Sequence, residues 1–305
     1  MRALKGKRRY PIWGGCLILA CLSLFLLGGC ASFYPPLSDQ EIVDAFSPGP
    51  VPVSKRVEIS GRSLHYVDTE ADQDALVVFV HGAPGAWDAF SGFLSDPRLT
   101  EKARLISVDR PGYGRSDLGK PERSLTEQAR LLSHVLQHRW DGAPTLLVGH
   151  SFGGPVVAQM ALDYPEQVDG LVMVAASVDP ALEQTKWYQV PAHWKLFSWM
   201  IPRDLYVTNE EILPLKGELE LLETRWDRLL QPMIVIQGGK DALVPKENAD
   251  YLERMAFASD LEIRRYPELS HFIPWSAPEL ITDAILQLLS DLSEPSGVDA
   301  EWELE

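Results

Sequence analysis

A serine in a glycine-rich turn is the first residue of this chain whose setting points to chemistry. The stretch Gly149-His150-Ser151-Phe152-Gly153 follows the apolar run Thr145–Val148 and precedes a helical pattern. This order of strand, tight turn and helix is the context of a G-x-S-x-G nucleophile elbow. Glycines at its two ends permit the close backbone approach of such a turn. The pattern therefore predicts that Ser151 is a nucleophile whose hydroxyl stands above the edge of a sheet.

A serine hydroxyl is a weak nucleophile until a base takes its proton, so the chain must also supply a histidine and a carboxylate that orients it. His271 lies in a loop between a late strand-like run and the last helical pattern, and we expect it to be the base. His150 belongs to the elbow and is better explained by packing beside it. The remaining histidines are His65, His81, His134, His138 and His193.

The elbow in this context resembles the α/β-hydrolase fold, and the resemblance covers roughly residues 55–292. It implies the chain order nucleophile, acid, histidine. Asp241 follows the strand-like run Met233–Ile236 in a stretch that matches the family's G-x-x-D-x-x-V-P pattern, and catalytic groups gather at such strand ends in open α/β sheets. Asp179, just after the run Leu171–Ala175, is the alternative acid, because some members of the family take their acid from that strand end.

The oxyanion that forms during acyl transfer needs backbone N–H donors, one from the residue after the nucleophile and one from the loop after the third strand. These positions are Phe152 and Ala83. The loop His81–Gly85 resembles the H-G-x-P-G stretch of epoxide hydrolases, haloalkane dehalogenases and many esterases. The first two groups use aspartate at the elbow, so Ser151 favours acyl chemistry instead. We interpret Asp109–Ser116, similar to another stretch of the same lineage, as a structural turn near the pocket.

The elements that must position these residues alternate between strands and helices, which predicts an α/β fold. Its sheet should be mostly parallel, of about eight strands, with an antiparallel start and helices on both faces. The predicted strands are Lys55–Ile59, Leu64–Asp68, Ala75–Val80, Arg104–Val108, Thr145–Val148, Leu171–Ala175, Met233–Ile236 and Leu261–Tyr266. The predicted helices are Ala86–Leu94, Leu125–Arg139, Phe152–Asp163, Glu247–Phe257 and Pro278–Leu292.

One interval breaks this alternation, because residues 178–231 separate two strands by far more than a crossover needs. We interpret it as a helical cap inserted between the core segments 55–177 and 232–292. The cap is rich in aromatic residues, of which Trp187, Trp194, Phe197 and Trp199 are candidates for substrate binding. They favour a small apolar acyl or aryl substrate. The alternative is that these rings only seal the core of the cap.

The N-terminus predicts export from the cytoplasm. Basic residues from Lys5 to Arg9 precede the apolar run Ile12–Leu27, as in a signal peptide of residues 1–29. The ending Leu27-Gly28-Gly29-Cys30 resembles the lipobox of bacterial lipoproteins, which implies cleavage before Cys30 and its acylation. The alternatives are an uncleaved N-terminal anchor and plain export with Cys30 as a spare thiol. Both anchored versions place the body outside the cytoplasmic membrane, on the periplasmic side in a Gram-negative cell.

Two flanking segments carry no evident chemistry. Residues 30–54 are rich in proline, with a helical turn or two within Ser38–Phe46, and are expected to form a semi-stiff tether between lipid and body. Residues 293–305 are acidic and are expected to form a solvated tail.

Composition narrows the function further. A chain of 305 residues with 46% hydrophobic residues has ample material for a core, and its net charge of −15 disfavours nucleic acid as a partner. The three cysteines, at positions 16, 21 and 30, leave the body without an intramolecular disulfide or a cysteine-ligated zinc. The expected chemistry needs no cofactor and no metal.

These observations predict a serine hydrolase that cleaves an ester-like acyl bond through an acyl-enzyme, anchored to a bacterial envelope membrane. The alternatives of the same fold are a carbon–carbon bond hydrolase, a perhydrolase and a catalytically inactive envelope binding protein. The oligomeric state and the natural substrate stay open.

Overall fold

The computed structural model describes residues 32–184, 187, 189–193, 201–256 and 258–293. Eight strands form one sheet, and every predicted strand is present within one or two residues at each end. They are β1 (Val53–Ile59), β2 (Arg62–Asp68), β3 (Leu76–Val80), β4 (Arg104–Val108), β5 (Thr145–His150), β6 (Gly170–Val174), β7 (Met233–Gly238) and β8 (Leu261–Tyr266).

The sheet runs in the order β1-β2-β4-β3-β5-β6-β7-β8. The pairs β1–β2 and β2–β4 are antiparallel, and all the other neighbours are parallel. The predicted α/β class with a mostly parallel sheet and an antiparallel start is therefore confirmed. Parallel strands bring their carboxyl ends to one edge, so the loops after β3, β5, β7 and β8 meet there.

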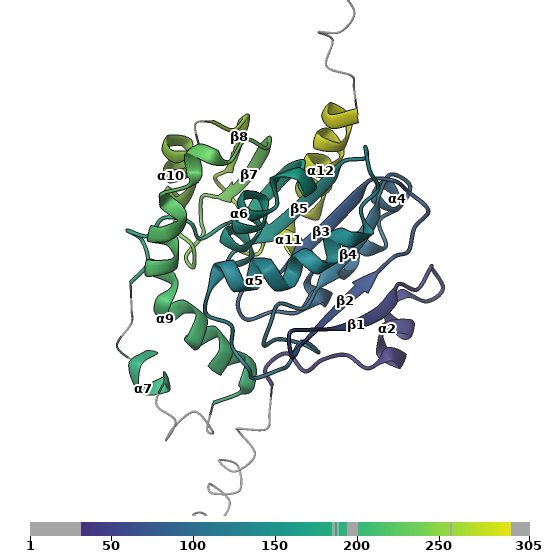
Figure 1. The fold of residues 1–305 in the computed structure, drawn as a ribbon, viewed down its shortest axis with the longest axis horizontal. Helices are drawn as coiled ribbons and strands as arrows, with labels where there is room; N and C mark the ends of the chain where they lie inside the picture. The colour runs from purple at the N-terminus through teal and green to yellow at the C-terminus, as the bar shows by residue number, and fades with distance from the viewer. Residues whose placement is uncertain (1–31, 185–186, 188, 194–200, 257, 294–305) are drawn as a thin grey trace, which may run out of the picture.

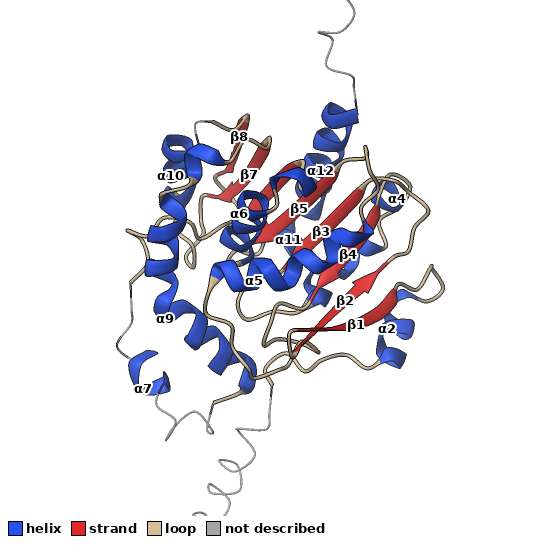
Figure 2. Cartoon of the chain, in the orientation of Figure 1, coloured by secondary structure: helices blue, strands red, loops and turns tan. Residues whose placement is uncertain are grey.

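Helices cover both faces of the sheet, and Figure 2 shows α5 and α6 in front of the strands. The helices are α2 (Asp39–Phe46), α3 (Ser91–Leu94), α4 (Pro97–Thr100), α5 (Leu125–Leu132), α6 (Gly153–Asp163), α7 (Gln189–His193), α9 (Arg203–Glu223), α10 (Glu247–Met255), α11 (Ile273–Ser276) and α12 (Pro278–Ser293). The helix predicted over Leu125–Arg139 is α only as far as Leu132 and continues as a 3₁₀ helix over Ser133–His138.

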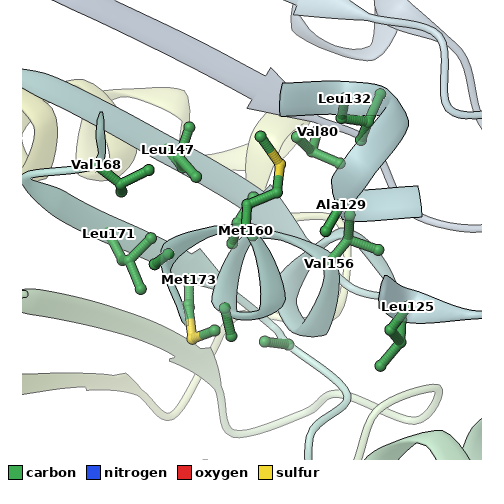
Figure 3. Packing of buried hydrophobic residues seen from close by; sticks show 14 of the residues in the cluster. Val80, Leu125, Ala129, Leu132, Leu147, Val156, Met160, Val168, Leu171 and Met173 are labelled. Atoms are coloured by element: carbon green, nitrogen blue, oxygen red, sulfur yellow. The ribbon is translucent and has the colours of Figure 1, made fainter. Parts of the chain in front are cut away.

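Two hydrophobic clusters flank the sheet because alternate strand residues face opposite sides. In β3, Val78 and Val80 belong to the cluster under α5, α6 and α10, whereas Val77 and Phe79 belong to the cluster under α3, α4 and α12. Figure 3 shows the first cluster, in which Met160 of α6 lies among side chains of β5, β6 and α5. Burial on both faces explains why the parallel strands are continuous apolar runs in the sequence.

The long helix α9 dominates the described part of the interval 178–231, and it runs along one side of the body (Figure 1). Leu215, Leu219 and Leu222 near its C-terminal end are buried in the core. Near its N-terminal end, the amide of Asn209 donates to the carbonyl of Gln189 at 3.0 Å, which ties α7 to α9. The described part of the insert therefore packs on the α/β core along α9, through the leucines near its C-terminal end and through the buried Glu211 in its middle.

Residues 32–52 differ from the expected tether, because they lie on the body. The helix α2 begins with a capping box between Ser38 and Glu41 and buries Ile42 and Phe46. The Phe46 ring stacks on Trp87 with centroids 6.3 Å apart. The guanidinium of Arg115 also donates to the carbonyl of Leu37 at 2.9 Å from Nε. The apolar spacing of Ile42 and Phe46 outweighs the stiffening effect of the prolines, since it gives α2 a face to bury.

No helix among residues 32–293 that the structure describes is both long and apolar enough to cross a membrane. The signal segment 1–29, Cys30 and the tail from residue 294 onward lie outside the described residues.

Candidate active site

Ser151 occupies a sharp turn between β5 and α6, with a φ of +56°. This left-handed conformation is strained for a residue with a side chain. A Cβ at Gly149 would lie 2.5 Å from the carbonyl oxygen of Gly153, and a Cβ at Gly153 would lie 2.2 Å from the carbonyl oxygen of Val80. Only glycine fits at these two positions, and the turn has the elbow geometry that the sequence predicts.

His271 and Asp241 meet at the carboxyl edge of the sheet. They follow the neighbouring parallel strands β8 and β7, and Nδ1 of His271 lies 2.8 Å from Oδ2 of Asp241. The other carboxylate oxygen accepts hydrogen bonds from the backbone N–H groups of Leu243 at 2.9 Å and Val244 at 2.8 Å. The Asp241 side chain is fully buried. Three donors thus fix this carboxylate, and it fixes the imidazole of His271 in turn.

The side chain of the alternative acid, Asp179, stabilises the turn in which it lies. Its Oδ1 accepts from the backbone N–H of Ala181 at 2.8 Å, and its own N–H donates to the side chain of Asn248 at 2.9 Å. The contacts of the Asp179 carboxylate with described residues include no histidine. The structure therefore brings Asp241, and not Asp179, to His271.

Ser151, His271 and Ala83 line one cavity of about 330 Å³. Ala83 belongs to the loop after β3, and Phe152 begins the turn into α6. Among the described residues, the backbone N–H groups of Ala83 and Phe152 have no hydrogen-bond acceptor. A backbone N–H group without an acceptor is available to a bound group. The cavity thus combines a hydroxyl, an oriented imidazole and the free donor of Ala83, and the free donor of Phe152 directly follows Ser151 in the chain.

His150 supports the loop that carries His271. Its Nε2–H donates to the carbonyl oxygen of His271 at 3.0 Å, and the two ring centroids are 4.7 Å apart. Burial, together with the nearby His271, lowers the pKa of His150 to about 3. The ring is therefore neutral and acts as a fixed donor, which agrees with the packing role expected from the sequence.

Arg110 holds the loop that carries Ala83, a role that sequence reasoning missed when it treated residues 109–116 as a structural turn. Its Nε donates to the carbonyl of His81 at 2.9 Å, and its Nη2 donates to the carbonyl of Gly82 at 3.1 Å. The guanidinium also stacks on the Phe152 ring, with Cζ 4.5 Å from the centroid. One buried cation therefore touches both segments that present the free donors.

The charge of Arg110 is balanced from α9. Glu211 accepts from Arg110 at 2.9 and 3.1 Å and from the hydroxyl of Tyr113 at 2.7 Å. Arg110 and Glu211 are both completely buried. Nothing local in the sequence could indicate this pair, since its members are separated by about a hundred residues.

His81 completes this network. Its Nε2 accepts from the backbone N–H of Arg110 at 3.0 Å, so its Nδ1–H donates to the carbonyl of Gly82 at 2.6 Å. Burial, followed by the charge of Arg110, lowers the pKa of His81 to about 3. A neutral His81 therefore stiffens the loop without competing as a base.

The rings that surround the cavity are not those expected from the cap. Trp187 is 84% exposed and does not line the cavity, and Trp194, Phe197 and Trp199 lie outside the described residues. The large apolar side chains that line it are Phe33, Tyr34, Leu243, Phe272 and Trp275. Phe272 directly follows His271 and Trp275 lies four positions after it, and this closeness to the predicted base is the sequence signal that could have identified them.

One acidic residue also lines the cavity. Asp88 lies in the turn that leads from the Ala83 loop to α3. Burial, followed by the negative charge of Asp109, raises the pKa of Asp88. Its carboxyl group is the one acidic side chain among the described residues that line the cavity. No group of three or more His, Cys, Asp and Glu side chains suited to a metal ion occurs in the described ranges.

Comparison with known proteins agrees with this geometry. The alpha/beta hydrolase fold family matches residues 75–210. A pimeloyl-[acyl-carrier protein] methyl ester esterase from Yersinia enterocolitica is 32% identical over 68% of this chain and 80% of that protein. A dihydrolipoyllysine-residue acetyltransferase component of the acetoin cleaving system from Pseudomonas putida is 24% identical over 79% of this chain and 70% of that protein.

Solved structures share the fold at low identity. A haloalkane dehalogenase from Agrobacterium tumefaciens superposes with a TM-score of 0.61 at 17% identity, over 81% of this chain and 99% of that one. Sequence and structure therefore agree that the chain belongs to the α/β-hydrolase fold family and is an enzyme of the hydrolase type.

Proposed function

We propose that this protein is a serine hydrolase that cleaves an ester-like acyl bond by way of an acyl-enzyme. The observation that carries the proposal is the buried Asp241 carboxylate bonded to Nδ1 of His271, whose ring lines the same cavity as Ser151. A hydroxyl, a base and an orienting carboxylate from three strand ends are the components of a Ser-His-Asp triad.

In the acylation step, Nε2 of His271 takes the proton of Ser151 while the serine oxygen attacks the substrate carbonyl carbon. Asp241 keeps the proton of His271 on Nδ1 and stabilises the imidazolium. The negative charge on the carbonyl oxygen is stabilised by the free N–H groups of Ala83 and Phe152. His271 then protonates the leaving alcohol, and the acyl group stays on Ser151.

In the deacylation step, water replaces the alcohol. His271 takes a proton from the water, hydroxide attacks the acyl carbon, and the proton passes to the oxygen of Ser151 as the acid departs. Serine at the elbow supports this route over epoxide opening or dehalogenation, for which related enzymes use aspartate there. Carbon–carbon hydrolysis and perhydrolysis use the same triad and are separate outcomes of the test.

The cavity supports a small apolar acyl or aryl substrate. Its volume of about 330 Å³ lies at the lower end of the usual range for small-molecule sites, and its walls carry Phe33, Tyr34, Phe272 and Trp275. The N-terminal sequence supports attachment of the body to an envelope membrane through Cys30. The protein then acts outside the cytoplasm.

A panel of p-nitrophenyl acetate, butyrate and octanoate tests the proposed reaction class. We expect hydrolysis of these esters by the wild type and loss of hydrolysis in Ser151→Ala, with the exposed serine variant Ser95→Ala as the matched control. A protein that hydrolyses none of them but cleaves a carbon–carbon bond or forms peracids would reassign the reaction within the fold. A wild type with no activity in any of these assays would indicate a binding protein.

A further inference from the structure

The mouth of the cavity is ringed by exposed hydrophobic side chains. Phe33, Tyr34, Leu243, Phe272 and Trp275 all line the cavity and are between 44% and 65% exposed. We call this set the apolar rim. Its members come from three separate segments, and the rings contact in pairs, with centroids 5.2 Å apart for Phe33–Tyr34 and 6.0 Å apart for Phe272–Trp275. Large apolar groups gathered around one opening are typical of an interaction site.

Part of the rim belongs to the segment that follows the proposed lipid attachment site. The backbone N–H groups of Phe33 and Tyr34 donate to the two carboxylate oxygens of Asp204 at 2.9 and 2.6 Å. Asp204 is buried in the first turn of α9. In Figure 1, the first described residues meet this end of α9. Phe33 and Tyr34 are therefore fastened to the body at the mouth of the cavity.

Chain length then limits how far the rim can lie from the membrane. Two residues, Ala31 and Ser32, lie between Cys30 and Phe33. A fully extended chain advances at most ~3.6 Å from one residue to the next, so the three steps from Cys30 to Phe33 span at most about 11 Å. An anchor at Cys30, or an uncleaved apolar segment ending at Leu27, keeps the rim within the reach of the lipid headgroups.

The charge of the molecule also favours this face. With a net charge of −15, the protein is repelled by anionic headgroups, but the five rim residues carry no charge. Aromatic side chains are also the residues that suit the boundary between lipid and water. The rim is therefore suited to lie against the lipid surface.

We infer that the mouth of the active-site cavity rests on the membrane that anchors the protein. The inference is drawn from the apolar rim, from the hydrogen bonds that hold Phe33 and Tyr34 to Asp204, and from the short chain between Cys30 and Phe33. The substrate is an amphiphilic acyl ester that passes from the lipid through the rim to Ser151. This inference rests on the proposed function for its chemistry and on membrane attachment for its geometry.

The position of the rim is measured with a fluorophore attached to a single introduced cysteine. The full-length chain, purified from the membranes of a bacterial host, is reconstituted into phosphatidylcholine–phosphatidylglycerol vesicles, and an environment-sensitive dye is attached at Leu243→Cys or Leu230→Cys. These leucines are a matched pair, 65% and 69% exposed, that lie beyond opposite ends of β7. We expect a blue-shifted emission that spin-labelled lipids quench for the dye at position 243, and neither effect for the dye at position 230.

Equal emission and quenching at the two positions would overturn the inference, as would a wild-type chain that does not stay with the vesicles. Labelling of Ser151 by a fluorophosphonate is measured on the same samples. A labelled Ser151 with a water-exposed dye at position 243 would reject the membrane orientation and leave the proposed hydrolase function intact. An unlabelled Ser151 with a lipid-buried dye at position 243 would reject the proposed hydrolase function and leave the membrane orientation intact.

The substrate class is tested by comparing two esters. For each variant, kcat/KM for a decanoyl ester held in the vesicles is divided by kcat/KM for a soluble acetyl ester, which corrects for any change in the chemistry. We expect Leu243→Asp to lower this ratio about tenfold, because a charge replaces an apolar contact with lipid. Leu230→Asp should leave the ratio unchanged. An equal ratio in both variants would show that the substrate does not enter from the lipid.

Discussion

The proposed mechanism depends first on the hydrogen bond by which the Asp241 carboxylate orients the His271 imidazole. Replacing Asp241 with asparagine keeps the size of the side chain but removes the anion that holds the proton on Nδ1 of His271. We expect Asp241→Asn to lower kcat by about 10⁴, the loss typical of such a change in a triad. Steady-state kinetics on p-nitrophenyl butyrate measures it.

The control for this substitution is Asp179→Asn, the same chemical change at the alternative acid. Asp179 bonds to the backbone of Ala181, so its replacement should leave kcat within about twofold of the wild type. A steep loss in Asp179→Asn together with full activity in Asp241→Asn would transfer the acid role to Asp179.

The raised pKa of Asp88 should make the stability of the folded protein depend on pH. Burial and Asp109 raise its pKa in the folded state, so the neutral carboxyl is favoured by folding. This contribution to stability is complete below the ordinary pKa of about 3.9 and is lost as the pH rises through the raised value. Asp88→Asn stays neutral at every pH. Its melting temperature should therefore exceed that of the wild type at pH 7.

This gain should shrink as the pH falls toward 4, because the raised pKa of Asp88 favours protonation of the wild-type carboxyl in the folded protein over the unfolded chain. Thermal unfolding at pH 7 and pH 4 measures the difference, with the exposed loop variant Asp74→Asn as the control. A gain from Asp88→Asn that is the same at both pH values would show that charge is not its cause.

At the scale of elements, the pair Arg110–Glu211 joins the loop of Ala83 to α9. Both side chains are completely buried, so Glu211→Ala leaves an unpaired guanidinium in the core and deprives the hydroxyl of Tyr113 of an acceptor. We expect the free energy of unfolding to fall by about 3–5 kcal/mol. We also expect a lower kcat, because Arg110 positions the carbonyls of His81 and Gly82. Urea unfolding and ester hydrolysis measure the two effects.

The matched control is Glu253→Ala, which breaks a 2.8 Å ion pair with Arg265 that is exposed on both sides. Exposed pairs of this kind contribute about 1 kcal/mol or less. If Glu211→Ala were no more destabilising than Glu253→Ala, the buried pair would not hold the two elements together.

The elements themselves were predictable because their patterns are local. Continuous apolar runs such as Thr145–Val148 appear where both faces of a strand are covered, and the five strands β3 to β7 were predicted in this way. The strands β1, β2 and β8 were predicted from shorter or half-exposed strand-like runs.

Ser151 and Asp241 were predicted because each stands after a continuous apolar run in a motif with defined neighbours. His271 was predicted from its place in the loop between the last strand and the last helix. Gly149 is likewise required by a contact within the elbow, with the carbonyl of Gly153, whereas Gly153 is required by its approach to the carbonyl of Val80 in β3.

What the sequence could not show depends on contacts between distant segments. Phe33 lies at the cavity only because its backbone bonds to Asp204, about 170 residues later in the chain. The density of rings in the cap does not determine which of them face the substrate, and Trp187 points to solvent. The proline content of residues 30–54 favoured a tether, whereas Ile42 and Phe46 supply the apolar face that packs this segment on the body.

At the scale of the whole molecule, attachment to the membrane depends on Cys30. A clickable palmitate analogue fed to a bacterial host should label the wild type and not Cys30→Ser. Each buried methylene contributes ~0.8 kcal/mol, so several acyl chains would hold the protein stably in the membrane fraction. An unlabelled wild type that is membrane-bound and retains residues 1–29 would establish an uncleaved anchor instead.

The identity of the nucleophile tests the proposed serine hydrolase function most directly. The purified full-length protein is treated with a fluorophosphonate, and its intact mass and the mass of the peptide that contains Ser151 are measured. The elbow geometry, the oriented His271 and the free donors of Ala83 and Phe152 predict one phosphonyl group per chain, located on Ser151, and no labelling of Ser151→Ala. Undiminished labelling of Ser151→Ala, or a wild type that stays unlabelled at saturating reagent, would contradict the assignment of this protein as a serine hydrolase.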